Sequence, residues 1–268
     1  MIEEGLAAGL TWEKSGKVAE KLVPVETGIR PEGYKLRKVK NKLDERLNYI
    51  RSLILNMGAF VEKTISSTSD ILLNKHPSSD IMYELQKREE EINTLQLKVS
   101  RVCFKILARE SPVAGDLRLI LAIVNANTDL ERMGDLAFNI AVRAGSVQKD
   151  PILDESLRLF ELMFTQVSKM VHKSLDAFVA EDEKLSRQIL IQDDNVDKAR
   201  NQIREGLEQI TLSHNRLIKP CIDLIIIAGE LERIADHATN IAEEVIFLKT
   251  GDDIRHQDLP DEDEYKNE

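Results

Sequence analysis

LERMGDLAFNIA at residues 130–141 and LERIADHATNIA at residues 231–242 are two versions of one twelve-residue sequence, with eight identical positions. Each copy has an acid, a second acid and an amide at i, i+4 and i+8, a spacing that places all three side chains on one face of an α-helix. The repeated stretch therefore predicts a helical protein that arose by internal duplication. The residues on the two ridges are Glu131, Asp135 and Asn139, and Glu232, Asp236 and Asn240.

Mostly apolar residues precede each ridge at alternating steps of four and three, as on the buried face of an amphipathic helix. They are Leu117, Leu121, Val124 and Thr128 before Glu131, and Ile218, Ile222, Ile225 and Gly229 before Glu232. We therefore expect the carboxylates to continue the face that packs in the core. A carboxylate buried there must be protonated, paired with a cation or bound to a metal, because an unpaired buried charge is very costly.

Helical periodicity extends from about residue 44 to residue 249 and is interrupted only by short segments that contain turn residues. The expected helices span about residues 44–75, 79–109, 111–144, 154–180, 182–213 and 215–249, the third starting at Ser111 and Pro112. No stretch has the pattern of a strand. The predicted fold is all-α, with two tandem, duplicated three-helix bundles at residues 44–146 and 150–250, an irregular N-terminal extension at 1–43 and an acidic C-terminal tail at 251–268.

The duplication extends to the second helix of each bundle, where Glu89 to Asn93 aligns with Asp193 to Asp197. The first acid of each segment lies between two apolar positions of one helical stripe. Each half of the protein is therefore expected to place acids on two facing helices.

Carboxylates that converge from two helices form an oxygen-rich site that suits iron, manganese, magnesium or zinc. Clustered carboxylates also raise one another's pKa values unless a cation neutralises them. His237 is about 100° around the helix from Asp236 and is expected to be a surface or packing residue. The predicted metal ligands are Glu131, Asp135, Glu232, Asp236, Asp193, Asp197 and Glu89, with Asn139, Asn240 and Asn93 as amides that orient them.

Two alternatives to a structural or sensory metal site remain open. Acidic ridges are often solvated faces or partners of nearby cations, and Arg132 and Arg233 lie beside these acids, so a helical adaptor without metal is one alternative. A carboxylate-bridged metalloenzyme is the other, although the ridges lack the Glu-x-x-His element of di-iron bundles.

Composition narrows the class of protein. The chain has 268 residues, a formal net charge of −10 and a pI near 5.2, which argue against a general nucleic-acid binder. Its two cysteines, Cys103 and Cys221, lie in helical apolar runs, as expected of small core residues in a reduced compartment. No apolar run is long enough to span a bilayer and the first residues are acidic, so we expect a cytoplasmic protein. A basic segment before residue 43 is interpreted as a solvated leader.

The sequence resembles the PhoU family over about residues 44–249. The resemblance is carried by PVAGDLR at residues 112–118, LERMGDLAFNIA at 130–141 and LERIADHATNIAEEV at 231–245. It implies two similar three-helix bundles side by side, in a cytoplasmic accessory protein of the phosphate-specific ABC transporter. Such a protein would be a non-enzymatic negative regulator of the phosphate-starvation response that links the transporter's ATPase subunit to a membrane sensor histidine kinase.

The resemblance also implies that E/DxxxD motifs bind multinuclear clusters of iron or zinc on the bundle surface, in preference to manganese or magnesium. Three pairs match this motif: Glu131 with Asp135, Glu232 with Asp236, and Asp193 with Asp197. Glu89 departs from it because Asn93 replaces the second acid, which predicts weaker binding in the first half. A homodimer is expected as well, since acidic ridges near a bundle surface can bridge subunits.

Overall fold

Six long helices account for most of the residues that the structure describes. The computed structural model describes residues 42–73, 79–148 and 150–254, so most of the predicted extension and tail lie outside the described residues. The helices are α1 (Lys42–Leu73), α2 (Ser79–Glu110), α3 (Ala114–Ser146), α4 (Asp154–Ala180), α5 (Glu183–Ser213) and α6 (Ile218–Thr250), with 3-10 turns at Pro151–Leu153 and Asn215–Leu217. The described residues contain no strand, which confirms the all-α prediction. No helix among them is both long and apolar enough to cross a membrane.

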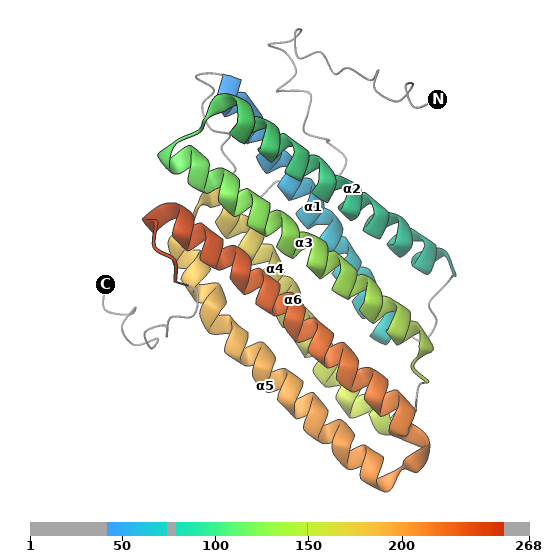
Figure 1. Ribbon diagram of the computed structural model, residues 1–268. Helices are drawn as coiled ribbons and strands as arrows, with labels where there is room; N and C mark the ends of the chain where they lie inside the picture. Colours follow the sequence, from blue (N-terminus) through green and yellow to red (C-terminus); the bar gives the residue numbers. More distant parts are fainter. Residues whose placement is uncertain (1–41, 74–78, 149, 255–268) are drawn as a thin grey trace, which may run out of the picture.

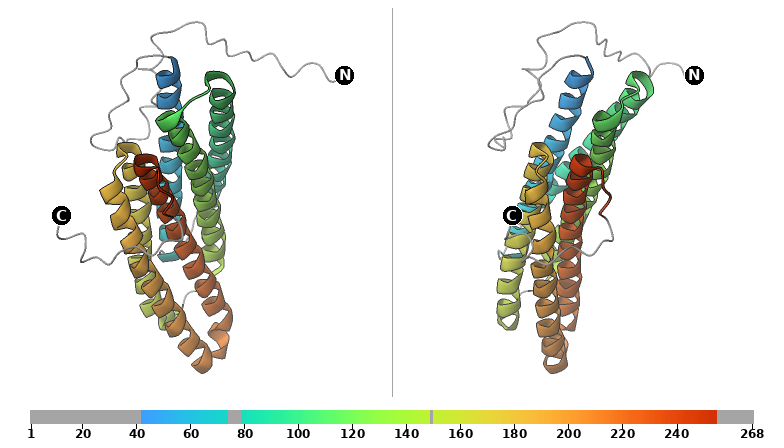
Figure 2. Two further views of the ribbon diagram at one scale, coloured as in Figure 1. Left: turned by 60° about the vertical axis from the view of Figure 1, so that its left-hand side comes forward. Right: turned by 90° about the vertical axis from the view of Figure 1, so that its left-hand side faces the viewer.

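The helices form two three-helix units, α1–α3 (the first bundle) and α4–α6 (the second bundle), as predicted. The units share one continuous core, because α3 packs against α6 and α1 packs against α4 (Figure 1). The outer helices differ: α2 packs mainly against α1 and α3, and α5 mainly against α4 and α6, so they lie at opposite edges of the molecule (Figure 2). Each outer helix therefore has one long face that no other helix of the described residues covers.

Helices α3 and α6 run antiparallel at the centre. Polar contacts between them pair rising residue numbers on α3 with falling numbers on α6: Asn125 with Glu244 at 2.8 Å, Asp129 with His237 at 2.8 Å and Arg143 with Asp223 at 3.0 Å. The two repeated twelve-residue sequences consequently lie across from each other in the middle of the molecule.

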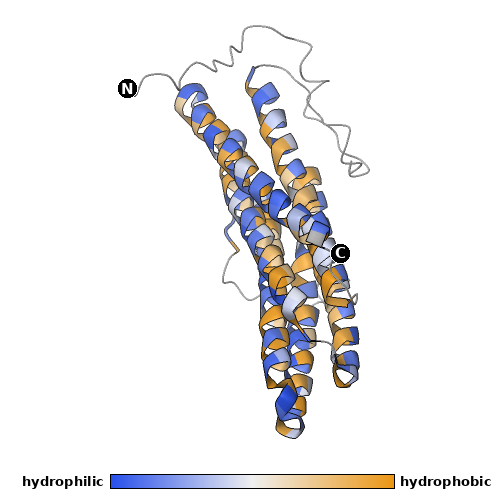
Figure 3. Cartoon of the chain, turned by 90° about the vertical axis from the view of Figure 1, so that its right-hand side faces the viewer, coloured by the Kyte–Doolittle hydropathy of each residue, from blue (hydrophilic) through white to orange (hydrophobic). Residues whose placement is uncertain are grey.

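Each helix buries one face among aliphatic side chains, and hydrophilic and hydrophobic segments alternate along the helices in Figure 3. Both cysteines lie in this core with no exposed surface, as predicted, and burial raises the pKa of the Cys103 thiol to about 12. These thiols are packing groups with little tendency to ionise.

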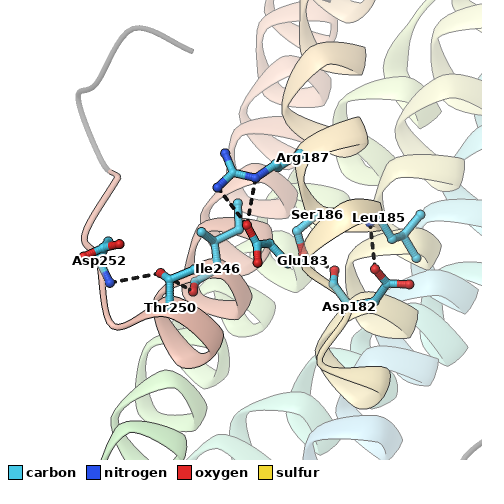
Figure 4. A network of polar contacts seen from close by, with 8 residues as sticks. All are labelled: Asp182, Glu183, Leu185, Ser186, Arg187, Ile246, Thr250 and Asp252. Atoms are coloured by element: carbon cyan, nitrogen blue, oxygen red, sulfur yellow. Dashed lines mark hydrogen bonds and ion pairs between the residues drawn. The ribbon is translucent and has the colours of Figure 1, made fainter. Parts of the chain in front are cut away.

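Hydrogen bonds fix the ends of the helices where α5 begins and α6 ends (Figure 4). The Asp182 carboxylate accepts a hydrogen bond from the Leu185 N–H at 3.0 Å, an N-cap that satisfies one free donor of α5. At the end of α6, Gly251 has φ of 83° and its N–H donates to the Phe247 carbonyl at 2.8 Å. A glycine suits this left-handed cap because it has no Cβ to clash.

The predicted start of the third helix was wrong by about three residues. Helix α3 begins at Ala114. The backbone has positive φ values at Ser111 (43°) in the connection and at Ala114 (47°), the first residue of the helix. Pro112 therefore belongs to the connection between α2 and α3 and is not in the first turn. Similarly, residues 215–217 form a 3-10 turn that precedes α6.

The prediction that the acidic ridges continue the core-facing stripe was also wrong. The apolar residues that precede the ridges are largely open to solvent: Leu121 is 42% exposed and Ile222 is 50% exposed. The core is formed by other faces of α3 and α6, which include Ile120, Ile123 and Leu224. Both helices are apolar around more than half of their circumference, so the periodicity of one stripe did not identify the buried face.

Packing between α2 and α3 depends on a glycine. A methyl group at Gly134 would lie 2.9 Å from Cδ1 of Ile92, which is closer than two carbons can pack. The repeat-related positions hold Ala235 and Val196, so the second bundle has one carbon more on α6 and one carbon fewer on α5. The two bundles thus fill equivalent space with different pairs of residues.

We expect Gly134→Ala to lower the free energy of unfolding by about 1 kcal/mol, because overpacking exceeds the gain in helix propensity. Adding Ile92→Val should restore most of that loss, although Ile92→Val alone is expected to be destabilising by about 1 kcal/mol. Chemical denaturation of the two single variants and the double variant measures this coupling. If the loss of unfolding free energy in the double variant equals the sum of the two single losses, Gly134 and Ile92 are not coupled by packing.

Candidate metal centre

Four carboxylates of the second bundle form one cluster, which we call the second acidic cluster: Asp193 and Asp197 on α5, and Glu232 and Asp236 on α6. Asp193 and Asp197 are one helical turn apart, as are Glu232 and Asp236, and α5 packs against α6 along its length. The negative charges act on one another, and the pKa of Glu232 is raised by burial and by Asp236. The pKa of Asp236 is raised by partial burial and by Asp197, although Asp236 keeps the most solvent contact of the four.

Asp193 is the most strongly perturbed member of the second acidic cluster. Burial, together with the charges of Asp236, Asp197 and Glu232, raises its pKa to about 7. Its Oδ1 atom is buried and has no hydrogen-bond partner among the described residues. Buried oxygens are almost always paired, so this atom points to a proton or a cation that completes its surroundings.

Among the described residues, one arginine forms an ion pair with the second acidic cluster. Arg200 on α5 has its Nη1 atom 3.3 Å from Oε1 of Glu232. Arg233, which the sequence places beside the acids, is exposed and makes no ion pair with a described residue. Arg200 and Arg233 lower the pKa values of Glu232 and Asp236, and His237 lowers that of Asp236, but these effects are smaller than that of burial, and the pKa values of both carboxylates remain raised.

The first bundle has a smaller group, the first acidic cluster, made of Glu89 on α2 with Glu131 and Asp135 on α3. The pKa of Glu131 is raised by burial, by Asp135 and by Glu89, and burial raises the pKa of Asp135. Asn93 donates a hydrogen bond from Nδ2 to Oε1 of Glu89 at 2.6 Å, while its Oδ1 atom is buried without a described partner. The amide therefore orients one carboxylate and presents an oxygen of its own.

A polar link between α3 and α6 lies beside both clusters and was not predicted. Asp129 accepts hydrogen bonds through Oδ1 from Asn240 at 3.1 Å, and its Oδ1 lies 2.8 Å from Nδ1 of His237. His237 is therefore a partly buried residue that connects the two bundles through Asp129, and Asn240 contacts an acid outside the predicted set. Asp129 and Glu230 occupy repeat-related positions, so the duplication in the sequence could have identified Asp129 as a candidate site residue.

Within each bundle the predicted ligands are near enough to affect one another's pKa values, and one predicted amide makes no contact with them. Asn139 is exposed and has no hydrogen bond to a described residue. Among residues 42–73, 79–148 and 150–254, no group of three or more His, Cys, Asp or Glu side chains is arranged to hold a metal ion.

The donor chemistry of the second acidic cluster nevertheless suits a cation. It offers four carboxylates, a buried Asp193 oxygen without a described partner, and one ion pair with an arginine of the described chain. The first acidic cluster offers three carboxylates and the Asn93 oxygen. Both sets consist of oxygen donors, which hard and borderline ions prefer.

Comparison with known proteins relates this arrangement to a family. The model of the PhoU domain matches residues 54–144 and 160–245. A phosphate-specific transport system accessory protein PhoU homolog from Zymomonas mobilis is 36% identical over 208 residues, which cover 78% of this chain and 86% of that protein. A protein of the same name from Aquifex aeolicus is 34% identical over 223 residues, 83% of this chain and 100% of that protein.

A solved structure agrees with the sequence matches. The crystal structure of PhoU from Pseudomonas aeruginosa resembles this fold with a TM-score of 0.74 and 33% identity, over 79% of this chain and 100% of that chain. The two matched segments of the family model correspond to the two bundles.

Proposed function

Because this chain belongs to the PhoU family, we propose that it is an accessory protein of phosphate transport that acts as a negative regulator of phosphate uptake and of the phosphate-starvation response. In this proposal it is a non-enzymatic, metal-binding adaptor that couples the ATPase subunit of a phosphate ABC transporter to a membrane sensor histidine kinase. The main support is that relatives named for the phosphate-specific transport system match about four-fifths of the chain, including both bundles.

The metal in this proposal is iron or zinc. Asp193, Asp197, Glu232 and Asp236 would hold it in the second bundle, and Glu89, Glu131 and Asp135 would hold it more weakly in the first. Binding requires these side chains to rearrange, because no metal-holding group is assembled among the described residues, and a cation would offset the repulsion between their charges. A bound ion would neutralise the carboxylates and tie the outer helix of each bundle to its central helix.

The proposal places the protein in the cytoplasm as a homodimer. The exposed apolar residues near the ridges offer area for contact with a second copy, because aliphatic side chains open to water favour association. They are Leu117, Leu121, Ile218, Ile222 and Ile226.

Complementation tests the regulatory role. In cells that lack this chain and grow in ample phosphate, a reporter of the starvation response is expected to be on, and the wild-type chain should turn it off. A variant with Asp193→Asn, Asp197→Asn, Glu232→Gln and Asp236→Asn should leave the reporter on, because the adaptor cannot take its metal-bound form. Immunoblotting must show equal amounts of both proteins.

A matched control removes four exposed acids elsewhere: Glu84→Gln, Glu90→Gln, Glu155→Gln and Glu205→Gln. This control changes net charge equally and is expected to repress the reporter like the wild type. If the reporter stays on when the wild-type chain is present, the regulatory role is contradicted. Turnover of a phosphate ester or an oxidisable substrate by the purified protein, lost in the first variant, would instead support a metalloenzyme.

A further inference from the structure

The second half of α2 presents a basic and apolar face to solvent. Residues 98–109 include four cations, Lys98, Arg101, Lys105 and Arg109, and no acid, in a chain whose formal net charge is −10. All four are exposed, and their apolar neighbours Leu97 and Phe104 are 54% and 63% exposed. We call these six residues the basic stripe.

Helical geometry places the basic stripe on one side of α2. Leu97, Arg101, Phe104 and Lys105 follow one another at steps of four, three and one, within about 100° of arc at 100° per residue. The opposite side of α2 holds Val99, Cys103 and Ile106, which are buried against the core. Since α2 packs mainly against α1 and α3 at one edge of the molecule, nothing in the described chain covers the stripe.

Most cations of the basic stripe form no ion pair with a described residue. Lys98 lies over the ring of Tyr49, with its Nζ atom 5.5 Å from the ring centroid. Arg101, Lys105 and Arg109 make no ion pair with any described residue, and the nearby Glu110 is paired with Arg46. The positive charge of the stripe is therefore available to a partner.

The duplicated helix shows that the fold does not require these residues. Positions 104 residues later on α5 have the same burial pattern, since Val99 and Cys103 correspond to the buried Ile203 and Leu207. On the exposed side, however, Glu205 occupies the position equivalent to Arg101, and Glu208 occupies the position equivalent to Phe104. Residues 202–213 carry one cation and two acids, and Arg204 pairs with Glu208 at 3.8 Å. The basic stripe is thus specific to the first bundle and does not serve packing.

We propose that the basic stripe of α2 docks on the surface of a membrane that contains anionic phospholipids. Interleaved cations and apolar side chains on one helix face are the pattern of helices that lie on such surfaces, where cations meet headgroups and Phe or Leu enter the acyl boundary. The acids of the protein lie mainly elsewhere, and screening over about 8 Å at physiological ionic strength keeps them from cancelling this local attraction. The inference stands independently of metal binding and of the regulatory role.

Vesicle flotation of the full chain tests the proposal. The protein is expected to float with vesicles of equimolar phosphatidylcholine and phosphatidylglycerol and to stay in solution with phosphatidylcholine alone. The variant R101Q/K105Q/R109Q should bind about 100-fold more weakly, because each cation near an anionic surface contributes a factor of about five. Phe104→Ser, which keeps every charge, should bind about tenfold more weakly. These residues are exposed, so circular dichroism should show unchanged helix content.

A control variant, R158Q/K169Q/K219Q, removes three exposed cations from α4 and α6 and is expected to bind like the wild type. Equal loss in both triple variants would mean that bulk charge drives binding, and it would overturn the proposal. Failure of the wild type to float would overturn it too. If immobilised polyglutamate then retained the wild type and not a variant that lacks Arg101, the basic stripe would be assigned to an acidic protein. Displacement by inorganic phosphate at constant ionic strength would show a site for the free ion and would also contradict lipid docking.

Discussion

Conversion of Asp193, Asp197, Glu232 and Asp236 to the corresponding amides is expected to lower the affinity of the second bundle for iron or zinc by more than about 100-fold, since even residues that only orient ligands contribute 10- to 100-fold. The amides keep the size of the side chains and lose the charge that attracts the ion. Elemental analysis of protein purified from metal-supplemented cells, followed by equilibrium dialysis with zinc, measures the change. The control with four exposed acids replaced should keep its metal.

The two bundles should differ in this experiment. Glu89→Gln, Glu131→Gln and Asp135→Asn in the first bundle are expected to remove the more weakly held part of the metal, because that cluster has three carboxylates and the Asn93 amide. Metal content that is unchanged in both variants would refute the proposed sites, while the fold and the family membership would stand. A larger loss from the first bundle would reverse the ranking.

The sequence predicted which helices place acids near one another, and it did not predict how those acids are buried. Duplication identified Asp193 and Glu232 as residues of facing helices, and the structure places them in one cluster. The stripe that leads to Glu232 was expected in the core, yet Ile222 is half exposed. Helical periodicity gives the angle of a residue around its own helix, whereas burial depends on which neighbours cover that angle.

The same limit applies to contacts between the bundles. Helix number and most helix ends followed from periodicity and from proline and glycine positions. The shared core did not, because it depends on α3 packing against α6 across about 100 residues of sequence. Asp129 was missed for this reason: its partner His237 is on the other bundle, and no spacing within one helix reveals that contact.

The metal-free protein is expected to become less stable as the pH rises. The pKa of Asp193 is about 7 in the folded protein against an ordinary value of 3.8, so the folded state holds a proton that the unfolded state has already lost. The stabilisation is complete below about pH 4 and disappears as the pH passes through 7. After allowance for solvent screening at this half-buried site, we expect a loss of about 2 kcal/mol between about pH 5 and pH 8 in protein treated with a chelator.

Asp193→Asn should remove this dependence, because an amide does not titrate and does not repel Asp197 or Asp236. The variant is therefore expected to be more stable than the wild type at about pH 8 and nearly equal to it at about pH 4, which thermal denaturation would show as a difference of about 5 °C at the higher pH. His172 acts in the same direction, since a hydrogen bond with Glu62 raises its pKa. His172→Gln separates the two contributions, because it should leave the Asp193 effect intact. Parallel stability curves for the wild type and Asp193→Asn would mean that Asp193 is already neutralised by protein groups, and the case for a cation at its unpaired oxygen would then be lost.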